Sequence, residues 1–352
     1  MSLPTLARRA LLAGAAATTL LSGLLSATPA VAQETPIKFQ LDWRFEGPAA
    51  FFLLPVAKGY FKDEKLNVTV DAGNGSGNAV NRVASGTYDM GFADLAALME
   101  FHANNPTAPN KPVAVMVVYN NTPSAVISLK KSGIKTPADL AGKKLGAPVF
   151  DAGRRAFPVF QKANGVGAVN WISMDPPLRE TMLAKGDVDA ITGFYFTSVL
   201  NLEARGVKAE DVAVMLYPNH GVKLYGNVII ASEEMVKKRP EQVKAFLRAF
   251  TKGARDVLAN PKAATAIVKD RDGIVNSELE ERRLRLAIDS SIATADARAE
   301  GFGAISGPRL ALMASQVADA YTTKSRIDPD VIWNGSFLPT AAERNILGAP
   351  KK

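Results

Sequence analysis

The fold of this chain is decided by FQLDWRFEGPAAFFLLPVAKGY, residues 39–60, where a short apolar strand leads into a polar, aromatic tip and then an apolar helix. A Gly-Pro pair starts that helix, where the missing N–H of proline costs no hydrogen bond. Open α/β sheets bind ligands at such strand-to-helix turns. We therefore expect Asp42 and Trp43 to contact a flat, polar ligand. In the alternative interpretation Trp43 fills the core. Arg44 and Glu46 are expected to face solvent.

An internal repeat predicts two similar units. Residues 83–90, VASGTYDM, and residues 183–190, LAKGDVDA, share the pattern apolar-Ala-x-Gly-x-x-Asp-apolar. In each copy we expect a helix to end at the Gly, which accepts the left-handed conformation, and a strand to begin after the Asp. A further tip follows each strand, GFAD in the first copy and TGFY in the second. The repeat therefore predicts a two-lobed binding protein.

Alternating strand-like and helix-like segments predict the same architecture twice, a largely parallel sheet covered by helices on both faces. The expected strands are residues 37–41, 66–71, 89–92 and 113–119 in the first lobe, and 144–147, 171–174, 189–192 and 212–217 in the second. We expect crossings between the lobes at residues 120–127 and 217–227. Lobe 1 would then comprise residues 33–122 and 225–352, and lobe 2 residues 123–224. Helices that pack on the first lobe are expected at residues 233–258, 277–294 and 308–323.

The first 32 residues have the features of an export signal. A pair of arginines, Arg8 and Arg9, precedes an apolar run at residues 10–25, and an Ala-Val-Ala cleavage pattern ends at Ala32. We therefore expect cleavage after Ala32 and a periplasmic mature protein. The two arginines leave both the general and the twin-arginine export routes open. No later run has the 18 uninterrupted apolar residues that are typical of a membrane span.

The composition argues against several classes of protein. The formal net charge is +8, and no Lys/Arg cluster is interleaved with aromatic residues, so we expect no nucleic-acid partner. The absence of cysteine excludes disulfides, thiolate metal sites and a cysteine nucleophile. The two histidines, His102 and His220, stand in no ligand spacing and give no support to a metal site or a Ser-His-Asp triad. We expect a monomeric binding protein without a cofactor rather than an enzyme.

A glycine-rich loop, GNGSGN at residues 73–78, follows one expected strand and precedes a helix. Its bare backbone can approach a ligand and direct N–H groups towards it, although a flexible turn without any ligand explains the same glycines. Aromatic, amide and carboxylate groups at other strand ends can complete the cleft around a planar ring. The residues expected to bind the ligand are Trp43, Asp42, Asn78, Asp94, Tyr119, Asp151, Arg154, Phe194 and Tyr225.

The corresponding loop of the second lobe is PVFDAGRR, residues 148–155. A helix N-terminus favours negative charge, and Arg154 or Arg155 would strengthen an anion site through forked hydrogen bonds. A ligand carboxylate or sulfonate would then bind here. In the alternative interpretation Asp151 caps the helix and both arginines lie in solvent or pair with acids.

Four blocks carry a resemblance to a known family. They are LDWRFEGPAAFFLLPVAKGYFKDEKLNVTV, GSGNAVNRVASGTYDMGFAD, KTPADLAGKKLGAP and LYGNVIIASEEMVKKRPEQVKAFLRA. In this order they resemble solute-binding proteins of the nitrate/sulfonate/taurine importers, in the branch similar to thiamine-pyrimidine-precursor (NMT1/THI5-like) binders. The resemblance implies a type II periplasmic binding fold, two lobes that close on a small solute, and delivery to an ABC permease with a cytoplasmic ATPase.

The resemblance leaves the solute open. In pyrimidine-binding relatives the Trp after the first strand helps hold the ring, and the matching residue is Trp43. In sulfonate-binding relatives small polar residues and helix N-termini bind the anion, and the matching loops are residues 75–78 and 151–155. The same fold also resembles the eukaryotic pyrimidine synthase of thiamine biosynthesis, an enzyme that consumes pyridoxal phosphate and one of its own histidines and has a Cys-rich iron site. The lack of cysteine and the export signal argue against that alternative.

Overall fold

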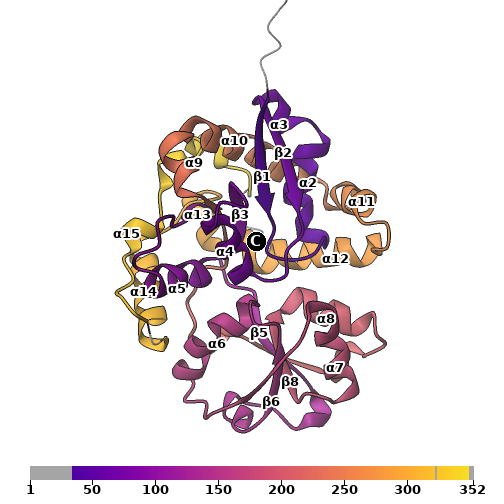
Figure 1. Ribbon diagram of the computed structural model, residues 1–352. Coiled ribbons are helices and arrows are strands. Elements are labelled where there is room, and N and C mark those ends of the chain that lie inside the picture. The colour runs from indigo at the N-terminus through magenta and orange to yellow at the C-terminus, as the bar shows by residue number, and fades with distance from the viewer. Residues whose placement is uncertain (1–33, 322, 349–352) are drawn as a thin grey trace, which may run out of the picture. The chain divides into compact units, whose positions relative to one another are not determined.

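A computed structural model describes residues 34–321 and 323–348, in which two five-stranded sheets are covered by helices (Figure 1). The predicted export signal, residues 1–32, lies outside this part of the chain. Across the described residues, none of the helices combines the length and the apolar character that crossing a membrane requires. The α/β fold class predicted from the alternating segments is confirmed.

The first sheet, with its helices called lobe 1 below, has the strand order β2-β1-β3-β10-β4. Its strands are β1 (Thr35–Gln40), β2 (Leu66–Asp71), β3 (Met90–Asp94), β4 (Val113–Val117) and β10 (Asn227–Ala231). Strands β1, β2 and β3 are parallel, and β10 runs antiparallel to both β3 and β4. The sheet is therefore mixed rather than largely parallel.

The second sheet, with its helices called lobe 2, has the order β7-β6-β8-β5-β9. Its strands are β5 (Ser124–Leu129), β6 (Lys144–Ala147), β7 (Asn170–Ser173), β8 (Ala190–Phe194) and β9 (Val212–Leu216). Here β5 runs antiparallel to β8 and β9. Each sheet therefore has one antiparallel strand in the fourth position, and the two lobes share one topology.

Strands β5 and β10 were not predicted, and the predicted crossings at residues 120–127 and 217–227 are too long. Both strands enter their sheets directly from a connection, without an intervening helix, so the expected alternation gives no sign of them. The chain instead passes between the sheets through residues 118–123 and 217–226.

These two connections are held together by Arg309 of α14 (Gly307–Ala320). Its guanidinium donates to the backbone oxygen of Asn120 at 2.6 Å in the first connection, and to that of Leu224 at 3.4 Å in the second. The two crossings are thus bound to one helix of lobe 1.

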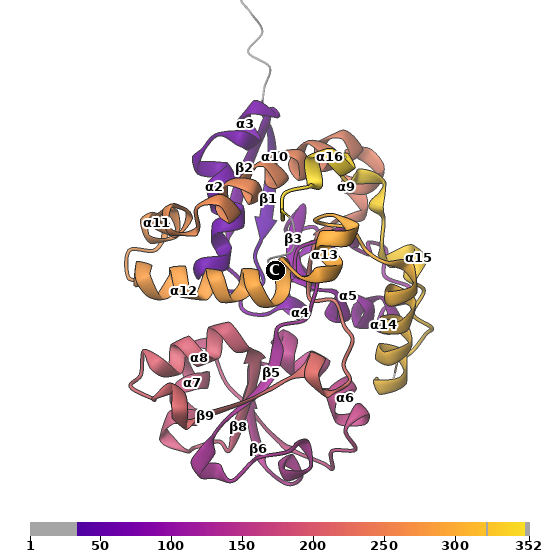
Figure 2. The ribbon, with the colours of Figure 1, turned by 180° about the vertical axis from the view of Figure 1, so that it is seen from behind.

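Seven helices lie in the segments between the strands, four in lobe 1 and three in lobe 2. They are α2 (Ala50–Ala57), α3 (Tyr60–Asp63) and α4 (Ser76–Ala84), then α5 (Leu95–Asn104), α6 (Ala152–Ala163), α7 (Arg179–Lys185) and α8 (Tyr195–Glu203). The remaining helices are α9 (Glu233–Lys238), α10 (Pro240–Ala259), α11 (Pro261–Arg271), α12 (Ser277–Ala287), α13 (Ala295–Glu300), α14, α15 (Pro329–Ile332) and α16 (Ala341–Arg344). Helix α12 lies along α8 of lobe 2 (Figure 2).

The predicted single helix over residues 233–258 is divided into α9 and α10. The break falls at Arg239, whose φ of −131° and ψ of 42° are not helical. Pro240 causes it, because proline has no N–H to donate and disfavours the helical conformation of the residue before it. The predicted helix over residues 277–294 likewise ends at Ala287, where one turn of π-helix follows.

Stacked aromatic rings fix the strand and helix that carry the tip of residues 42–46. The ring of Phe39 on β1 lies 4.8 Å from that of Phe52 on α2 and 5.2 Å from that of Phe246 on α10. Phe52 in turn lies 5.0 Å from Phe250. Such pairs add to the stabilisation that burial provides, so β1 and α2 form a rigid base for the tip.

The internal repeat has a structural role. Both helices end at a glycine with positive φ, 77° at Gly86 and 83° at Gly186, as predicted. The carboxylate of Asp89 accepts the backbone N–H of Lys38 at 2.7 Å, and that of Asp189 accepts the N–H of Lys144 at 2.8 Å. Each repeated aspartate therefore binds the backbone of the neighbouring strand, β1 or β6.

Candidate functional site

A cavity lies where β1 and β3 of lobe 1 face β6 and β8 of lobe 2, at the carboxyl ends of all four strands. This is the edge at which open α/β sheets bind ligands, and in both sheets these strands flank the point where the strand order reverses. The lining residues are Leu41, Asp42, Trp43, Arg44, Glu46, Pro48, Ala49, Phe52, Gly75, Ser76, Phe92, Tyr119, Asp151, Ala152, Arg179, Phe194, Phe196 and Thr197. Its free volume is about 40 Å³, enough for a few water molecules.

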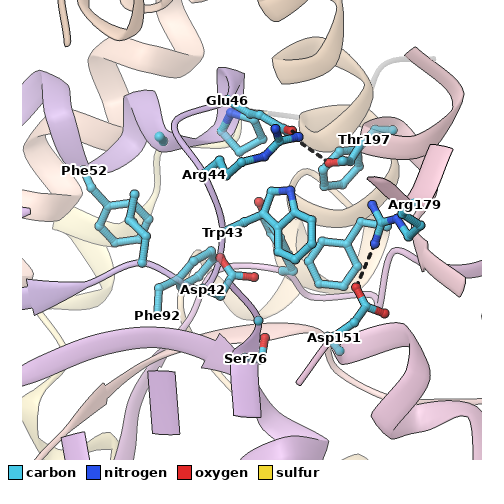
Figure 3. Close-up of a pocket in the computed structure, with 18 residues that line it drawn as sticks. Asp42, Trp43, Arg44, Glu46, Phe52, Ser76, Phe92, Asp151, Arg179 and Thr197 are labelled. Carbon is cyan, nitrogen blue, oxygen red and sulfur yellow. Dashed lines mark hydrogen bonds and ion pairs between the residues drawn. The ribbon is translucent and has the colours of Figure 1, made fainter. Parts of the chain in front are cut away.

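Five of the nine residues predicted to bind the ligand line this cavity. They are Asp42, Trp43, Tyr119, Asp151 and Phe194. Figure 3 shows the Trp43 indole at the centre, with Asp42 and Ser76 on the lobe 1 side and Asp151 and Arg179 on the lobe 2 side. The tip after β1 and the loop after β6 are thus brought together. Ligand binding by these five residues stays a prediction.

Arg154 does not line the cavity. Its guanidinium donates to the backbone oxygen of Ala147 at 2.9 Å and to Ser173 Oγ at 3.0 Å, and it lies 4.6 Å from the centre of the Trp171 ring. Burial lowers the pKa of Arg154 from its usual value. These contacts hold the side chain within lobe 2, so the predicted anion site at Arg154 is not formed.

The alternative interpretation of this loop is the one that the structure shows. Asp151 accepts the backbone N–H of Arg154 at 2.9 Å and caps α6. Arg155 forms an ion pair with Glu100 of lobe 1 at 2.7 Å. The N-terminus of α6 therefore already has its negative charge, and neither arginine is free to bind an anionic solute.

Tyr225, Asn78 and Asp94 also lie outside the lining. The Tyr225 hydroxyl accepts the N–H of Ser306 at 2.9 Å, and its ring centre lies 4.0 Å from the Arg309 guanidinium. Asn78 is a half-buried residue on α4. Asp94 caps α5 through the N–H of Ala96 at 2.9 Å. Tyr225 therefore packs beside the lobe connections, whereas Asp94 lies behind the cavity.

Arg179 of α7 was missed, although it lines the cavity from lobe 2. It is 1% exposed, donates to Asp151 at 2.9 Å and to Glu180 at 2.8 Å, and its guanidinium lies 5.0 Å from the centre of the Trp43 ring. A Cβ at Gly193 would lie 2.5 Å from its Nη1 atom, so glycine is required there. Only the two prolines and the Arg-Glu pair at the start of α7 mark the position in the sequence, and neither feature indicates burial.

Glu46 was expected to face solvent, but it is buried and joins the lobes. Its Oε2 atom accepts the hydroxyl of Thr197 at 2.8 Å, across the cavity (Figure 3). The neighbouring N–H of Gly47 donates to Glu280 of α12 at 2.6 Å. Arg44 lies 3.4 Å from Glu46, with 40% of its side chain exposed. Trp43 is half-buried and lines the cavity, and it is not among the buried residues of the core.

Two carboxyl groups at the lobe 1 side of the cavity are buried without a cation. Burial raises the pKa of Asp42 to about 7, against the lowering effect of a 2.7 Å hydrogen bond from Asn227. Burial also raises the pKa of Asp94 to about 7, although backbone N–H groups of α5 bind it and lower its pKa. In the described part of the chain, neither carboxyl group forms an ion pair with a lysine or arginine.

Asp94→Asn is expected to stabilise the protein at pH 8, because asparagine is an equally good helix cap and removes a buried charge. Asp42 and Asp151 face Asp94 and add to its high pKa. The folded state keeps this proton between about pH 4 and pH 7 while the unfolded state loses it, so stability falls as pH rises through that range. The gain at pH 8 is expected to be about 2 kcal/mol or more.

Urea unfolding at pH 5 and pH 8 measures this gain. Asp270→Asn, at an exposed position of α11, is the matched control and is expected to change little at either pH. A gain of equal size at pH 5 and pH 8 would contradict the assignment of a proton to Asp94.

Neither histidine lines the cavity. His102 is buried on α5, where its Nε2 atom contacts the backbone oxygen of Pro112 at 2.7 Å and burial lowers its pKa. The ring of His220 packs 5.6 Å from Phe160. Among residues 34–321 and 323–348, no group of three or more His, Asp or Glu side chains is arranged to hold a metal ion.

Two similar α/β lobes that enclose one cavity at the carboxyl ends of their strands form the type II periplasmic binding protein fold. The alkanesulfonate-binding protein SsuA from Xanthomonas axonopodis pv. citri, solved with MOPS, has this fold. It matches with a TM-score of 0.66 at 13% identity, over 87% of this chain and 98% of SsuA. The family model described as NMT1/THI5 like matches residues 49–264, more than half of the chain, and the protein belongs to this family.

Curated relatives in this family include binding proteins and enzymes. The chain is 24% identical to the formylaminopyrimidine-binding protein of Halalkalibacterium halodurans, over 72% of this chain and 77% of that protein. It is 28% identical to the 4-amino-5-hydroxymethyl-2-methylpyrimidine phosphate synthase of Aspergillus parasiticus, over 65% of this chain and 68% of that protein.

Proposed function

We propose that the protein is the exported solute-binding component of an ABC importer, and that it encloses a small planar organic solute between two lobes divided at residues 122/123 and 224/225. One observation carries the proposal: the Trp43 tip of lobe 1 and the α7 segment of lobe 2 meet at a cavity built at the strand ends of both sheets. After export and cleavage behind Ala32, the periplasmic monomer would deliver its solute to a permease with a cytoplasmic ATPase.

Closure of the lobes is the step that couples binding of the solute to recognition of the protein by the permease. A ligand favours the closed form only through contacts that the open form lacks. Contacts of this kind exist between the lobes, at Glu46 with Thr197 and at the N–H of Gly77, which donates to the backbone oxygen of Phe150 at 3.2 Å. A solute held between Trp43 and lobe 2 adds to these contacts, and the permease then recognises the closed form.

The walls of the cavity suit a planar solute. Six aromatic rings line it, from Trp43, Phe52, Phe92, Tyr119, Phe194 and Phe196. Aromatic rings provide a large contact area with fixed geometry, which a flat heterocycle matches. The name of the formylaminopyrimidine-binding relative supports such a solute. Arg154 lies outside the cavity, so the expected site for an organic carboxylate or sulfonate is not part of this lining.

The pyrimidine phosphate synthases among the relatives support a second candidate, an enzyme of pyrimidine synthesis. We favour binding without chemistry, because both arginines of the cavity are already paired with acids and neither histidine reaches it. Incubation with the bound solute, followed by mass spectrometry, is expected to return that solute unchanged. A converted product would favour the enzyme.

The test of binding is a thermal-shift screen of the mature protein with aminopyrimidines, flavins and aromatic sulfonates. A ligand that binds only the folded state raises the melting temperature by mass action. We expect an aromatic nitrogen heterocycle to give the largest shift. A screen in which none of these compounds shifts the melting temperature would contradict the proposal.

Trp43→Ala is expected to weaken binding of the solute found in this screen at least tenfold, about 1.4 kcal/mol, because half-buried Trp43 supplies the central face of the cavity. Isothermal titration measures the affinity, and circular dichroism checks the fold. Trp171→Ala is the control, since Trp171 is also half-buried but packs against Arg154 outside the cavity. Equal effects of the two substitutions on affinity would remove Trp43 from the site.

A further inference from the structure

We propose that the cavity takes its solute as a cation: a planar nitrogen base that presents N–H donors and positive charge to Asp42. This inference rests on the proposed function, because it specifies the solute of the same site. It follows from the charges around the cavity, from the hydrogen-bonding groups left unpaired beside it, and from the aromatic walls.

Acidic groups outnumber basic ones around the cavity. Asp42, Glu46 and Asp151 line it, together with Arg44 and Arg179. Each of the two arginines is already bound by an acid. Arg179 pairs with Asp151 at 2.9 Å and with Glu180 at 2.8 Å. Arg44 lies 3.4 Å from Glu46. Among the acids of the lining, Asp42 is therefore the one that these arginines leave unpaired.

A second acid, Asp94, lies behind Asp42. The two are linked by Asn227, which lies opposite Asp94 in the register of β3 and β10 and donates to Asp42 Oδ2 at 2.7 Å. In surroundings that exclude water, each carboxyl group that is ionised adds negative potential at the other. A single positive group placed at Asp42 would therefore be stabilised by two acids, and a negative group would be repelled by both.

The buried polar atoms without a partner around the cavity include two donors, Trp43 Nε1 and Arg44 Nε, as well as acceptors close to Asp42. Asp94 Oδ2 and Asn227 Oδ1 are buried and have no hydrogen-bond partner, and neither has the hydroxyl of Ser76, which lines the cavity and is 1% exposed. Leaving such groups unpaired costs about 1–3 kcal/mol each. The charged acceptor within reach of a solute is Asp42, and a solute rich in N–H donors complements it, with Ser76 beside it.

The aromatic rings that line the cavity also favour a positively charged solute. The faces of Trp43, Tyr119 and Phe194 carry negative electrostatic potential, and they attract a cation by about 0.5–2 kcal/mol per ring when water is excluded. The Arg179 guanidinium already makes a contact of this kind, 5.0 Å from the centre of the Trp43 ring. A flat cation can thus stack on the rings while its edge donates to Asp42.

Three planar compounds of nearly equal size and different charge test the inference: benzamidine, which is cationic, benzamide, which is neutral, and benzoate, which is anionic. They are compared at millimolar concentrations and pH 8 by thermal shift and isothermal titration. We expect benzamidine to bind at least tenfold more tightly than benzamide, and benzoate to give no shift. In Asp42→Asn, which keeps the acceptor for Asn227, the preference for benzamidine over benzamide is expected to disappear. In Asp270→Asn it is expected to remain.

The possible outcomes separate this inference from the proposed function. Binding of benzamide or benzoate as tight as that of benzamidine would overturn the cationic solute while supporting a site for planar solutes. An unchanged preference in a folded Asp42→Asn protein would overturn the role of Asp42. No shift with any of the three compounds would overturn the inference, and the proposed function would then depend on the separate screen of heterocycles.

Discussion

Arg283→Met is expected to lower the free energy of unfolding by about 3–5 kcal/mol. Arg283 lies on α12 and is 1% exposed. Its guanidinium binds Glu280 at 2.8 Å, and in lobe 2 it donates to the backbone oxygen of Thr197 and to Asn201 Oδ1, each at 2.9 Å. Methionine fills a similar space but leaves Glu280 buried without a positive charge, and it removes one of the two guanidiniums near Glu46, 3.6 Å away.

The neighbouring residue provides a matched control. Arg282 also joins α12 to α8, through Glu203 at 2.6 Å, but the two side chains are 50% and 41% exposed. Arg282→Met is therefore expected to cost at most about 1 kcal/mol. Urea unfolding at pH 8 and pH 5 measures both variants. The penalty of Arg283→Met is expected to be smaller at pH 5, because burial raises the pKa of Glu280 and loss of Arg283, which lowers that pKa, favours the neutral carboxyl group further. Equal penalties in the two variants would contradict this account.

Arg179→Met is expected to have a destabilising effect of the same size, about 3–5 kcal/mol. This guanidinium neutralises two buried acids, Asp151 and Glu180, whose side chains are 6% and 0% exposed. Its removal leaves both charges in a medium that solvates them poorly. The change also removes the cation that lies over the Trp43 ring, so the rigidity of the Trp43 side chain is expected to fall as well.

A double substitution tests the reason for this loss. Adding Glu180→Gln to Arg179→Met removes one of the two uncompensated charges while keeping an acceptor for the hydroxyl of Ser198, which binds Glu180 at 2.9 Å. The double variant is therefore expected to be more stable than the single variant in urea unfolding. If the destabilisation by Arg179→Met and that by Glu180→Gln simply add in the double variant, the electrostatic explanation is wrong and Arg179 stabilises lobe 2 by packing alone.

Local patterns predicted the parts of the site that lie within one segment. Asp42 and Trp43 stand where a strand meets a helix, and that turn can be recognised from a few neighbouring residues. Asp151 was found for the same reason, although the sequence left open whether it caps the helix or assists an anion site. The fold class followed from the alternation of segments and from the repeat.

Contacts between distant segments could not be predicted in this way. Glu46 and Thr197 are separated by 151 residues, and Gly47 and Glu280 by 233. Charged side chains are usually exposed, so local sequence gave no reason to bury Glu46. The prediction that Arg154 lies at the cavity failed for a different reason. The oxygens of Ala147 and Ser173 lie within reach of its guanidinium and bind it outside the cavity.

The repeated aspartates, Asp89 and Asp189, stabilise each sheet at a place remote from the residues that line the cavity. Both lie at the amino ends of strands β3 and β8, whereas the cavity lies at the opposite ends of the same strands. Substitutions at the tips can therefore change which solute is accepted without disturbing the junction that keeps the strands aligned. A scaffold divided in this way can serve unrelated solutes, and new specificity can be engineered at one edge of each sheet while the other edge is left untouched.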